Sequence, residues 1–360
     1  MSLNKKYQLS IANYQLFCTF ALTMENPYVK QYPELMAGKT VLYCHGFASS
    51  GQSGTVTRLR TVMPEAKVIA PDLPVHPEEA IALLHDICKK EHPDLIIGTS
   101  MGGMYAEQLY GYDRICVNPA LEMGETMKAH GMTGTQQFQN PRLDGVQEFY
   151  VDKSLIKEYK ERSEHRFEGV TDEERQRVFG LFGDNDTTVN TFDMFRQVYP
   201  QAIHFHGEHR MNDQSFMHSV IPVIRWIDDK QEKRERPIIY IGIETMMDRY
   251  QHPTASLQKA VRMLIEDYQV YFVCPTENRW ERWKNAGEPT ENCWGQWLEE
   301  YINVPAWHHT VYTERRDLLY GDFLIARQKE GDPMATFLEY GSDTFKTWDD
   351  IIVFFERLKS

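Results

Sequence analysis

Short apolar segments alternate with amphipathic helical patterns over the first two thirds of the chain. Residues 77–91 show the helical pattern, because their apolar side chains recur at helical spacing. Continuous apolar runs stand between such patterns, at 40–44, 66–70, 94–98, 114–118, 178–182 and 202–205. Apolar strands joined through helices are typical of a parallel sheet that is covered on both faces. The pattern therefore predicts an α/β fold with a mostly parallel sheet and helices on both faces.

Two segments depart from this alternation. Residues 1–38 have a helical pattern, and we interpret them as a lead-in that packs onto the body of the domain. Residues 121–177 are polar and helix-prone, and they separate two of the predicted strands. Insertions of this kind often cover a pocket, so we expect a cap-like element there.

A charged run at 228–236, ended by Pro237, indicates a domain boundary. We interpret the run as the exposed end of a helix that passes into a linker. The alternation then restarts with a strand, a helix and a strand, at 238–243, 254–266 and 270–274. We therefore predict a first domain at 1–232 and a second, smaller α/β domain of Rossmann-like type at 237–360.

Composition and charge narrow the classes of partner. The chain has 52 acidic and 39 basic residues, a formal net charge of −13 and a pI near 5.5. Nucleic acid and anionic membranes attract basic surfaces, so we expect neither as a partner. The six cysteines have no CxxC or zinc-ligand spacing, and no apolar stretch has the length of a transmembrane helix. We expect a cytoplasmic protein that needs no metal or organic cofactor.

The segment Gly98-Thr99-Ser100-Met101-Gly102 matches the G-x-S-x-G pattern in an informative context. It follows the apolar run 95–97 and precedes a helical pattern that begins at Gly102. A sharp turn from strand to helix strains the serine backbone and raises its hydroxyl clear of the sheet, which is the nucleophile elbow of α/β-hydrolases. The alternative is an ordinary serine in a glycine-rich turn, but this context favours Ser100 as a nucleophile.

A nucleophilic serine needs a base, and the base needs an orienting acid. On this fold the acid and then the histidine follow the serine along the chain. Asp186 comes after the strand at 178–182 and is our preferred acid, while Asp184 remains the alternative. In the preferred assignment Asp184 caps its own turn. His209 follows the next strand and is the predicted base.

Backbone N–H groups are the expected donors to the developing oxyanion. One belongs to Met101, directly after the nucleophile, and the other to Phe47 in the loop after the first strand. We expect side chains of the loop at 45–50, with Leu73 and Met104, to line the acyl pocket. His204 and His206 share one face of a strand, but packed histidines are commoner than metal ligands at such a spacing.

From Thr40 to Trp226 the chain resembles the small bacterial α/β-hydrolase esterases of the YqiA type. The matching segments are 42–50, 71–73, 97–103, 117–120, 183–189 and 207–209. The resemblance implies esterase or thioesterase activity on acyl substrates, with Ser100, Asp186 and His209 in the positions of the catalytic triad. The insertion departs from the family in detail, so the resemblance does not imply a particular substrate.

Residues 237–360 resemble the haloacid-dehalogenase-like (HAD-like) fold, particularly its 5′-nucleotidase branch. The resemblance places Gly242 and Glu244 where that family has its two aspartates, and Ala326 and Arg327 where it has a late acidic pair. Glycine cannot form an aspartyl-phosphate, and Arg327 repels a cation. We therefore predict the fold without phosphatase activity, serving to bind a protein partner, to self-associate or to shape the entrance of the hydrolase site.

A cluster of aromatic residues in the second domain has two interpretations. Its members are Trp280, Trp283, Trp294, Trp297, Tyr301 and Trp307. They form either a ligand platform or part of the domain's own core, and we favour the core.

Two hypotheses of function follow from the sequence. The first is a serine hydrolase that cleaves a carboxylic ester or thioester through an acyl-enzyme on Ser100. The second is a non-catalytic binding or scaffold protein that retains the hydrolase fold. The complete set of serine, acid, histidine and glycines favours the enzyme, with a small acyl ester or thioester as its substrate.

Overall fold

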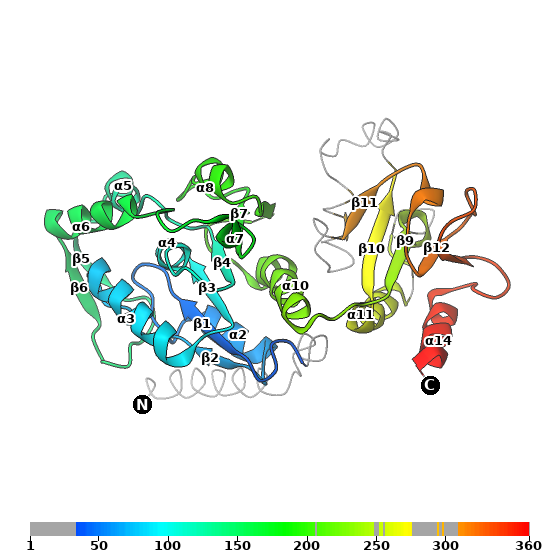
Figure 1. The fold of residues 1–360 in the computed structure, drawn as a ribbon, viewed down its shortest axis with the longest axis horizontal. Helices are drawn as coiled ribbons and strands as arrows, with labels where there is room; N and C mark the ends of the chain where they lie inside the picture. The colour runs from blue at the N-terminus through cyan, green and yellow to red at the C-terminus, as the bar shows by residue number, and fades with distance from the viewer. Residues whose placement is uncertain are drawn as a thin grey trace, which may run out of the picture.

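The computed structural model describes most of the chain. The described residues are 34–205, 207–247, 252–254, 256–275, 294, 297–298 and 309–359. The predicted helical lead-in at 1–38 therefore lies outside the described residues, except for a turn at 34–38. Figure 1 shows two sheets, one in each half of the chain, connected through helix α10 (Ile221–Glu232).

The first sheet has six parallel strands in the order β2-β1-β3-β4-β7-β8. Their bounds are β1 Thr40–Cys44, β2 Lys67–Ile69, β3 Leu95–Thr99, β4 Arg114–Val117, β7 Val178–Gly183 and β8 Ala202–Phe205. The connecting helices include α2 (Gly54–Val62), α3 (Pro77–Glu91), α4 (Met101–Glu107) and α8 (Phe192–Val198). All six strands were predicted to within two residues at either end.

Burial alternates along the strands of this sheet. Leu42 and Ile96 belong to one hydrophobic cluster, whereas their neighbours Val41 and Ile97 belong to another. Successive side chains of a strand point to opposite faces, so the two clusters are the cores on the two sides of the sheet. This confirms the predicted sheet with both faces covered.

The segment at 121–177 forms both helices and a hairpin. Its helices are α5 (Met123–Ala129), α6 (Lys153–Glu164) and the short α7 (Asp172–Arg175). Between α5 and α6, strands β5 (Gly134–Gln137) and β6 (Glu148–Val151) pair in antiparallel register. The sequence predicted helices here but not the hairpin, because its strands are short and mostly polar.

The second sheet has five parallel strands in the order β11-β10-β9-β12-β13. Their bounds are β9 Ile238–Gly242, β10 Gln269–Cys274, β11 Thr310–Tyr312, β12 Phe323–Ala326 and β13 Thr336–Glu339. Helices α11 (Leu257–Asp267) and α14 (Trp348–Lys359) supply much of its apolar core. A second α/β unit was therefore correctly predicted.

Four of the six aromatic residues of the predicted cluster lie outside the described residues. They are Trp280, Trp283, Tyr301 and Trp307. Trp297 is buried in the core of the second sheet, and Trp294 packs against that core. The core interpretation is confirmed for these two tryptophans.

Arginines join α10 to the second sheet. Arg225 of α10 donates to the Ile265 carbonyl at 2.5 Å and the Tyr268 carbonyl at 3.3 Å, at the end of α11. Arg236 donates to the Glu266 carbonyl beside them and pairs with Asp229 of α10 at 3.0 Å. The last carbonyls of a helix lack partners within the helix and carry partial negative charge, so these guanidinium groups fix the end of α11.

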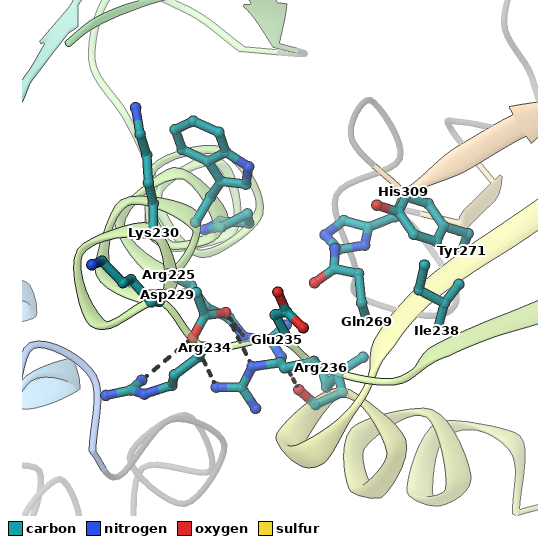
Figure 2. A pocket seen from close by; sticks show the side chains of 14 residues that line it. Arg225, Asp229, Lys230, Arg234, Glu235, Arg236, Ile238, Gln269, Tyr271 and His309 are labelled. Atoms are coloured by element: carbon teal, nitrogen blue, oxygen red, sulfur yellow. Dashed lines mark hydrogen bonds and ion pairs between the residues drawn. The ribbon is translucent and has the colours of Figure 1, made fainter. Parts of the chain in front are cut away.

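A pocket of 490 Å³ lies beside this joint. Figure 2 shows Lys230 of α10 on one side of it and Gln269, Tyr271 and His309 on the other. The pocket carries charges of both signs, because Glu235 lines it together with the basic residues.

The charged run is less exposed than the sequence predicted. Asp228 is only 1% exposed, because Lys39 at 2.6 Å and Arg234 at 3.0 Å cover its carboxylate. The prediction of an exposed helix end was wrong at this residue, since the run supplies buried ion pairs as well as a connection. In the described part of the chain, no helix combines the length and the apolar character needed to cross a membrane.

Candidate active site

Ser100 occupies a strained turn between β3 and α4. Its backbone has φ 55° and ψ −120°, a conformation that a non-glycine residue rarely adopts. A hydrogen bond from its N–H to the Val117 carbonyl at 2.9 Å helps to hold the turn. A Cβ on Gly98 would lie 2.2 Å from the Gly102 carbonyl oxygen, and a Cβ on Gly102 would lie 2.0 Å from the Cys44 carbonyl oxygen. Both glycines are therefore required by close backbone packing.

The structure brings Ser100, His209 and Asp186 together from three different loops. The His209 Nε2 lies 2.9 Å from the Ser100 Oγ. The His209 Nδ1 lies 2.7 Å from the Asp186 Oδ2. The imidazole thus connects the hydroxyl to the carboxylate, which is the arrangement of a nucleophile, a base and an orienting acid.

Asp184, the alternative acid, serves a different contact. Its Oδ1 accepts a hydrogen bond from the Gly207 N–H at 3.0 Å, so it ties its own turn to the loop that precedes His209. The two ring nitrogens of His209 contact Ser100 and Asp186. The geometry therefore favours Asp186 as the partner of the imidazole.

The environment of Asp186 keeps its carboxylate ionised. Burial is the largest influence on its pKa and acts to raise it. The hydrogen bond with His209 and those from the Val189 and Thr188 N–H groups outweigh burial, so the pKa lies below its usual value. The two backbone bonds reach Oδ1 at 3.0 Å and 2.7 Å. An ionised carboxylate only accepts hydrogen bonds, so it holds the proton of His209 on Nδ1 and leaves Nε2 free to accept one from Ser100.

Asn118 is a positioning residue that the sequence reasoning did not assign. It is buried at 2% exposure just after β4. Its Nδ2 donates to the carbonyls of Glu208 and His209 at 3.1 Å each, and its Oδ1 accepts from the Gly183 N–H at 2.7 Å. The Asn118 amide therefore holds the loop of His209 against the end of β7, where the loop of Asp186 begins. The sequence placed Asn118 at the end of a strand but could not show what its amide contacts.

The loop after β1 lies directly against Ser100. A Cβ on Gly46 would be 3.4 Å from the Ser100 Cβ, so the backbone that leads to Phe47 passes beside the serine. Met101 is the first residue of α4, a position whose N–H has no acceptor within the helix. The placement of both residues is compatible with the predicted oxyanion hole, whose function stays a prediction.

His45 holds this loop in place. Its Nδ1 contacts the Gly46 carbonyl at 2.8 Å, and its Nε2 accepts from the Leu73 N–H at 3.0 Å. Burial lowers the pKa of His45 to about 4, so the ring is neutral at physiological pH and can act as donor and acceptor at once.

A pocket of 640 Å³ opens at Ser100 and His209. Its wall includes Met123 and His130, together with polar residues of the hairpin that contains β5 and β6. The segment at 121–177 therefore contributes to the site, in agreement with the position expected of a cap. The described part of the chain holds no cluster of three or more metal-ligating side chains.

Only some of the residues predicted for the acyl pocket lie at the opening. Phe47, Ala48 and Ser49 of the loop after β1 line the pocket at Ser100. Leu73 and Met104 are buried in the core of the first sheet and do not line the pocket at Ser100. Leu73 lies in the coil after β2 and Met104 within α4, and both side chains pack into the core. His204 was not assigned a ligand role, and it stacks on Phe192 with ring centroids 3.8 Å apart. His206 lies outside the described residues.

Comparison with known sequences identifies the family. The family described as "Uncharacterised protein family (UPF0227)" matches residues 40–224, which is more than half of the chain. The chain belongs to the UPF0227 family. The matched region spans the whole first sheet and the three residues brought together at Ser100.

Solved structures with the α/β-hydrolase fold resemble the UPF0227 region at low identity. The thioesterase domain from the curacin biosynthetic pathway has a TM-score of 0.33 and 15% identity, covering 52% of this chain and 90% of that one. A marine microorganism esterase has a TM-score of 0.35 and 15% identity, covering 54% and 95%. Est1E from Butyrivibrio proteoclasticus has a TM-score of 0.36 and 13% identity, covering 55% and 88%. The parallel sheet and the strained serine turn are those of an α/β-hydrolase.

The second sheet lies beyond the UPF0227 match, and an ion pair occupies the end of its central strand. Glu244 follows β9 directly, and Arg316 donates to both of its carboxylate oxygens at 2.6 Å and 2.7 Å. Arg327 donates from Nε to the Glu244 carbonyl at 2.8 Å. Two guanidinium groups therefore surround the only carboxylate among Gly242, Glu244, Ala326 and Arg327, which disfavours a divalent cation there.

Proposed function

We propose that this UPF0227 protein is a serine hydrolase that cleaves a carboxylic ester or thioester through an acyl-enzyme on Ser100. The observation that carries the proposal is the His209 imidazole, which lies 2.9 Å from the Ser100 Oγ and 2.7 Å from Asp186. The strained turn at Ser100 and the pocket that opens there support it. A scaffold without turnover has no need to maintain this combination of strain and aligned side chains.

In this mechanism the Ser100 Oγ attacks the substrate carbonyl carbon while its proton moves to the His209 Nε2. Asp186 stabilises the imidazolium that forms, and the N–H groups of Phe47 and Met101 bind the developing oxyanion. The imidazolium then gives its proton to the departing oxygen or sulfur, leaving the acyl group on Ser100. Water, deprotonated by His209, attacks this ester and releases the acid and the free serine. Neither a metal nor an organic cofactor takes part.

Reaction with a fluorophosphonate probe, followed by intact-mass analysis, tests the proposal. Wild-type protein is expected to gain a single adduct, and Ser100→Ala to gain none. Circular dichroism of both proteins controls for folding. A folded wild type without an adduct, or an adduct that persists in Ser100→Ala, would contradict the assignment of Ser100.

We also propose that residues 1–232 and 237–360 form separate domains in a cytoplasmic protein. The two parallel sheets with their own cores support the division into domains, and the reduced buried thiols of Cys44, Cys88, Cys116 and Cys274 support the cytoplasmic location.

The second domain is HAD-like without phosphatase activity, and it binds a protein partner or a second copy of the chain. The test is p-nitrophenyl phosphate with Mg²⁺, for which no turnover is expected, together with size-exclusion chromatography of the full chain. Phosphate release that depends on Glu244 would contradict the proposal.

A further inference from the structure

The pocket at Ser100 has an unusual charge for this protein. The chain carries a formal net charge of −13, yet no described residue that lines the pocket is an aspartate or a glutamate. Two arginines, Arg58 and Arg210, line it together with His130 and His209. In an acidic protein, a cavity with basic side chains and no lining carboxylate attracts anions and repels cations.

Arg210 carries the less compensated of the two arginine charges. Its Nη2 donates to the Gln139 Oε1 at 3.0 Å, and among the described residues it forms no ion pair. Arg58, by contrast, is paired with Asp213 at 2.5 Å. A neutral amide leaves the charge of Arg210 intact, and its guanidinium has further N–H groups for a second acceptor.

Arg210 lines the same pocket as Ser100 and His209. It follows His209 in sequence and donates to Gln139 in the 137–147 segment. That segment is itself fixed, because the Gln139 N–H donates to the Ala48 carbonyl at 2.8 Å and the Asn140 Nδ2 donates to the Ser49 Oγ at 3.2 Å. The guanidinium is therefore held between the loop of His209 and the 137–147 segment.

The remaining wall combines polar and apolar side chains. Side-chain amides of Gln136, Gln137, Gln139 and Asn140 line it, whereas a binding site for a long acyl chain is lined predominantly by apolar side chains. Apolar contacts come from Phe47 and Val117 and from the methionines Met123, Met132 and Met211. The wall therefore offers donors for an anionic group beside an apolar surface for a small acyl group.

We propose that the substrate is a small ester or thioester that carries an anionic group, a carboxylate or a phosphate, and that Arg210 binds this group. The inference rests on the proposed hydrolysis at Ser100 and specifies its substrate class. The anion belongs either to the acyl part or to the leaving group. In both cases its charge-assisted hydrogen bonds with the guanidinium orient the ester toward Ser100.

Two matched pairs of esters test the proposal and locate the anion. Mono-p-nitrophenyl succinate is compared with p-nitrophenyl butyrate for an anion in the acyl part. The second pair, p-acetoxyphenyl phosphate and p-methoxyphenyl acetate, tests an anion in the leaving group. For at least one pair, we expect wild type to have the higher kcat/KM for the anionic ester. In Arg210→Gln the anionic-to-neutral ratio should fall about tenfold or more, and Arg210→Lys should restore part of it. Arg60→Gln, an exposed arginine outside the pocket, is the matched control and should keep the wild-type ratio.

Fluorophosphonate labelling separates this proposal from the proposed function. Free succinate or phenyl phosphate should slow labelling of wild type, and should slow labelling of Arg210→Gln much less. Normal labelling with equal ratios in wild type and Arg210→Gln, and without competition by either anion, would overturn the anionic substrate while leaving the serine hydrolase intact. Absence of labelling in folded wild type would instead reject the hydrolase on which the inference rests.

Discussion

Replacing Asp186 with asparagine tests the contact that orients the His209 imidazole in the proposed mechanism. The Asp186 Oδ1 accepts the Thr188 and Val189 N–H groups at 2.7 Å and 3.0 Å, and the Oδ2 accepts from His209 at 2.7 Å. Asparagine has nearly the same shape, so its carbonyl oxygen keeps the two backbone bonds. Its NH₂ group then faces the His209 Nδ1 and favours the tautomer with the proton on Nε2. In that tautomer the imidazole cannot accept the proton of Ser100.

The expected effect is large on catalysis and small on folding. In a serine protease with the same arrangement, the corresponding change lowers kcat about 10⁴-fold, which is about 5.5 kcal/mol of activation free energy. The same geometry at His209 predicts a loss of about that size here. The melting temperature should change little, because the backbone bonds at Oδ1 remain.

Steady-state hydrolysis of p-nitrophenyl butyrate and the rate of fluorophosphonate labelling measure this effect. Asp184→Asn is the matched control, because Asp184 bonds the Gly207 N–H at 3.0 Å and does not contact His209. Its loss should stay below about tenfold, the cost of one weakened hydrogen bond. Retention of more than a tenth of the activity in Asp186→Asn, or an equal loss in Asp184→Asn, would refute the assignment of the acid.

Three further predictions concern the residues that shape the site. Asn118→Ala should lower kcat more than it raises KM, because it releases the loop of His209 from its two hydrogen bonds at 3.1 Å. Equal changes in both constants would argue against a role of Asn118 in positioning His209. His45 has a folded pKa of about 4 against 6.5 unfolded, so the unfolded state binds more protons in this window and the free energy of unfolding should rise with pH. Urea titrations from pH 4 to pH 6.5 should show that His45 contributes a rise on the order of 3 kcal/mol in the free energy of unfolding, and His45→Gln should lack this rise. If the pH dependence of unfolding were the same in the variant, His45 would not be its source. Gly102→Ala would place a methyl group 2.0 Å from the Cys44 carbonyl oxygen. It should therefore abolish fluorophosphonate labelling of Ser100 and lower the melting temperature. A fully active variant would show instead that the turn can relax.

The sequence determined the elements and their order to a large extent. Apolar runs and helical spacing depend on local periodicity, so the predicted strands at 40–44 and 202–205 and the helix at 77–91 have the bounds that the structure gives them. The elbow at Ser100 was also readable, because its glycines and its place between a strand and a helix are local features. Chain order on this fold then indicated where the acid and the base lie.

Only the tertiary structure decided which side chains meet. Asp184 and Asp186 stand two residues apart with similar local sequence, and the fold of the loop alone directs Asp186 to His209. Likewise, the hydrogen bond from Asn118 to the His209 carbonyl joins segments about ninety residues apart in the chain. Gln139 reaches the pocket from a hairpin whose short strands have no clear pattern of apolar and polar residues. Local propensity acts over a few residues, whereas these contacts depend on how distant loops pack at one edge of the sheet.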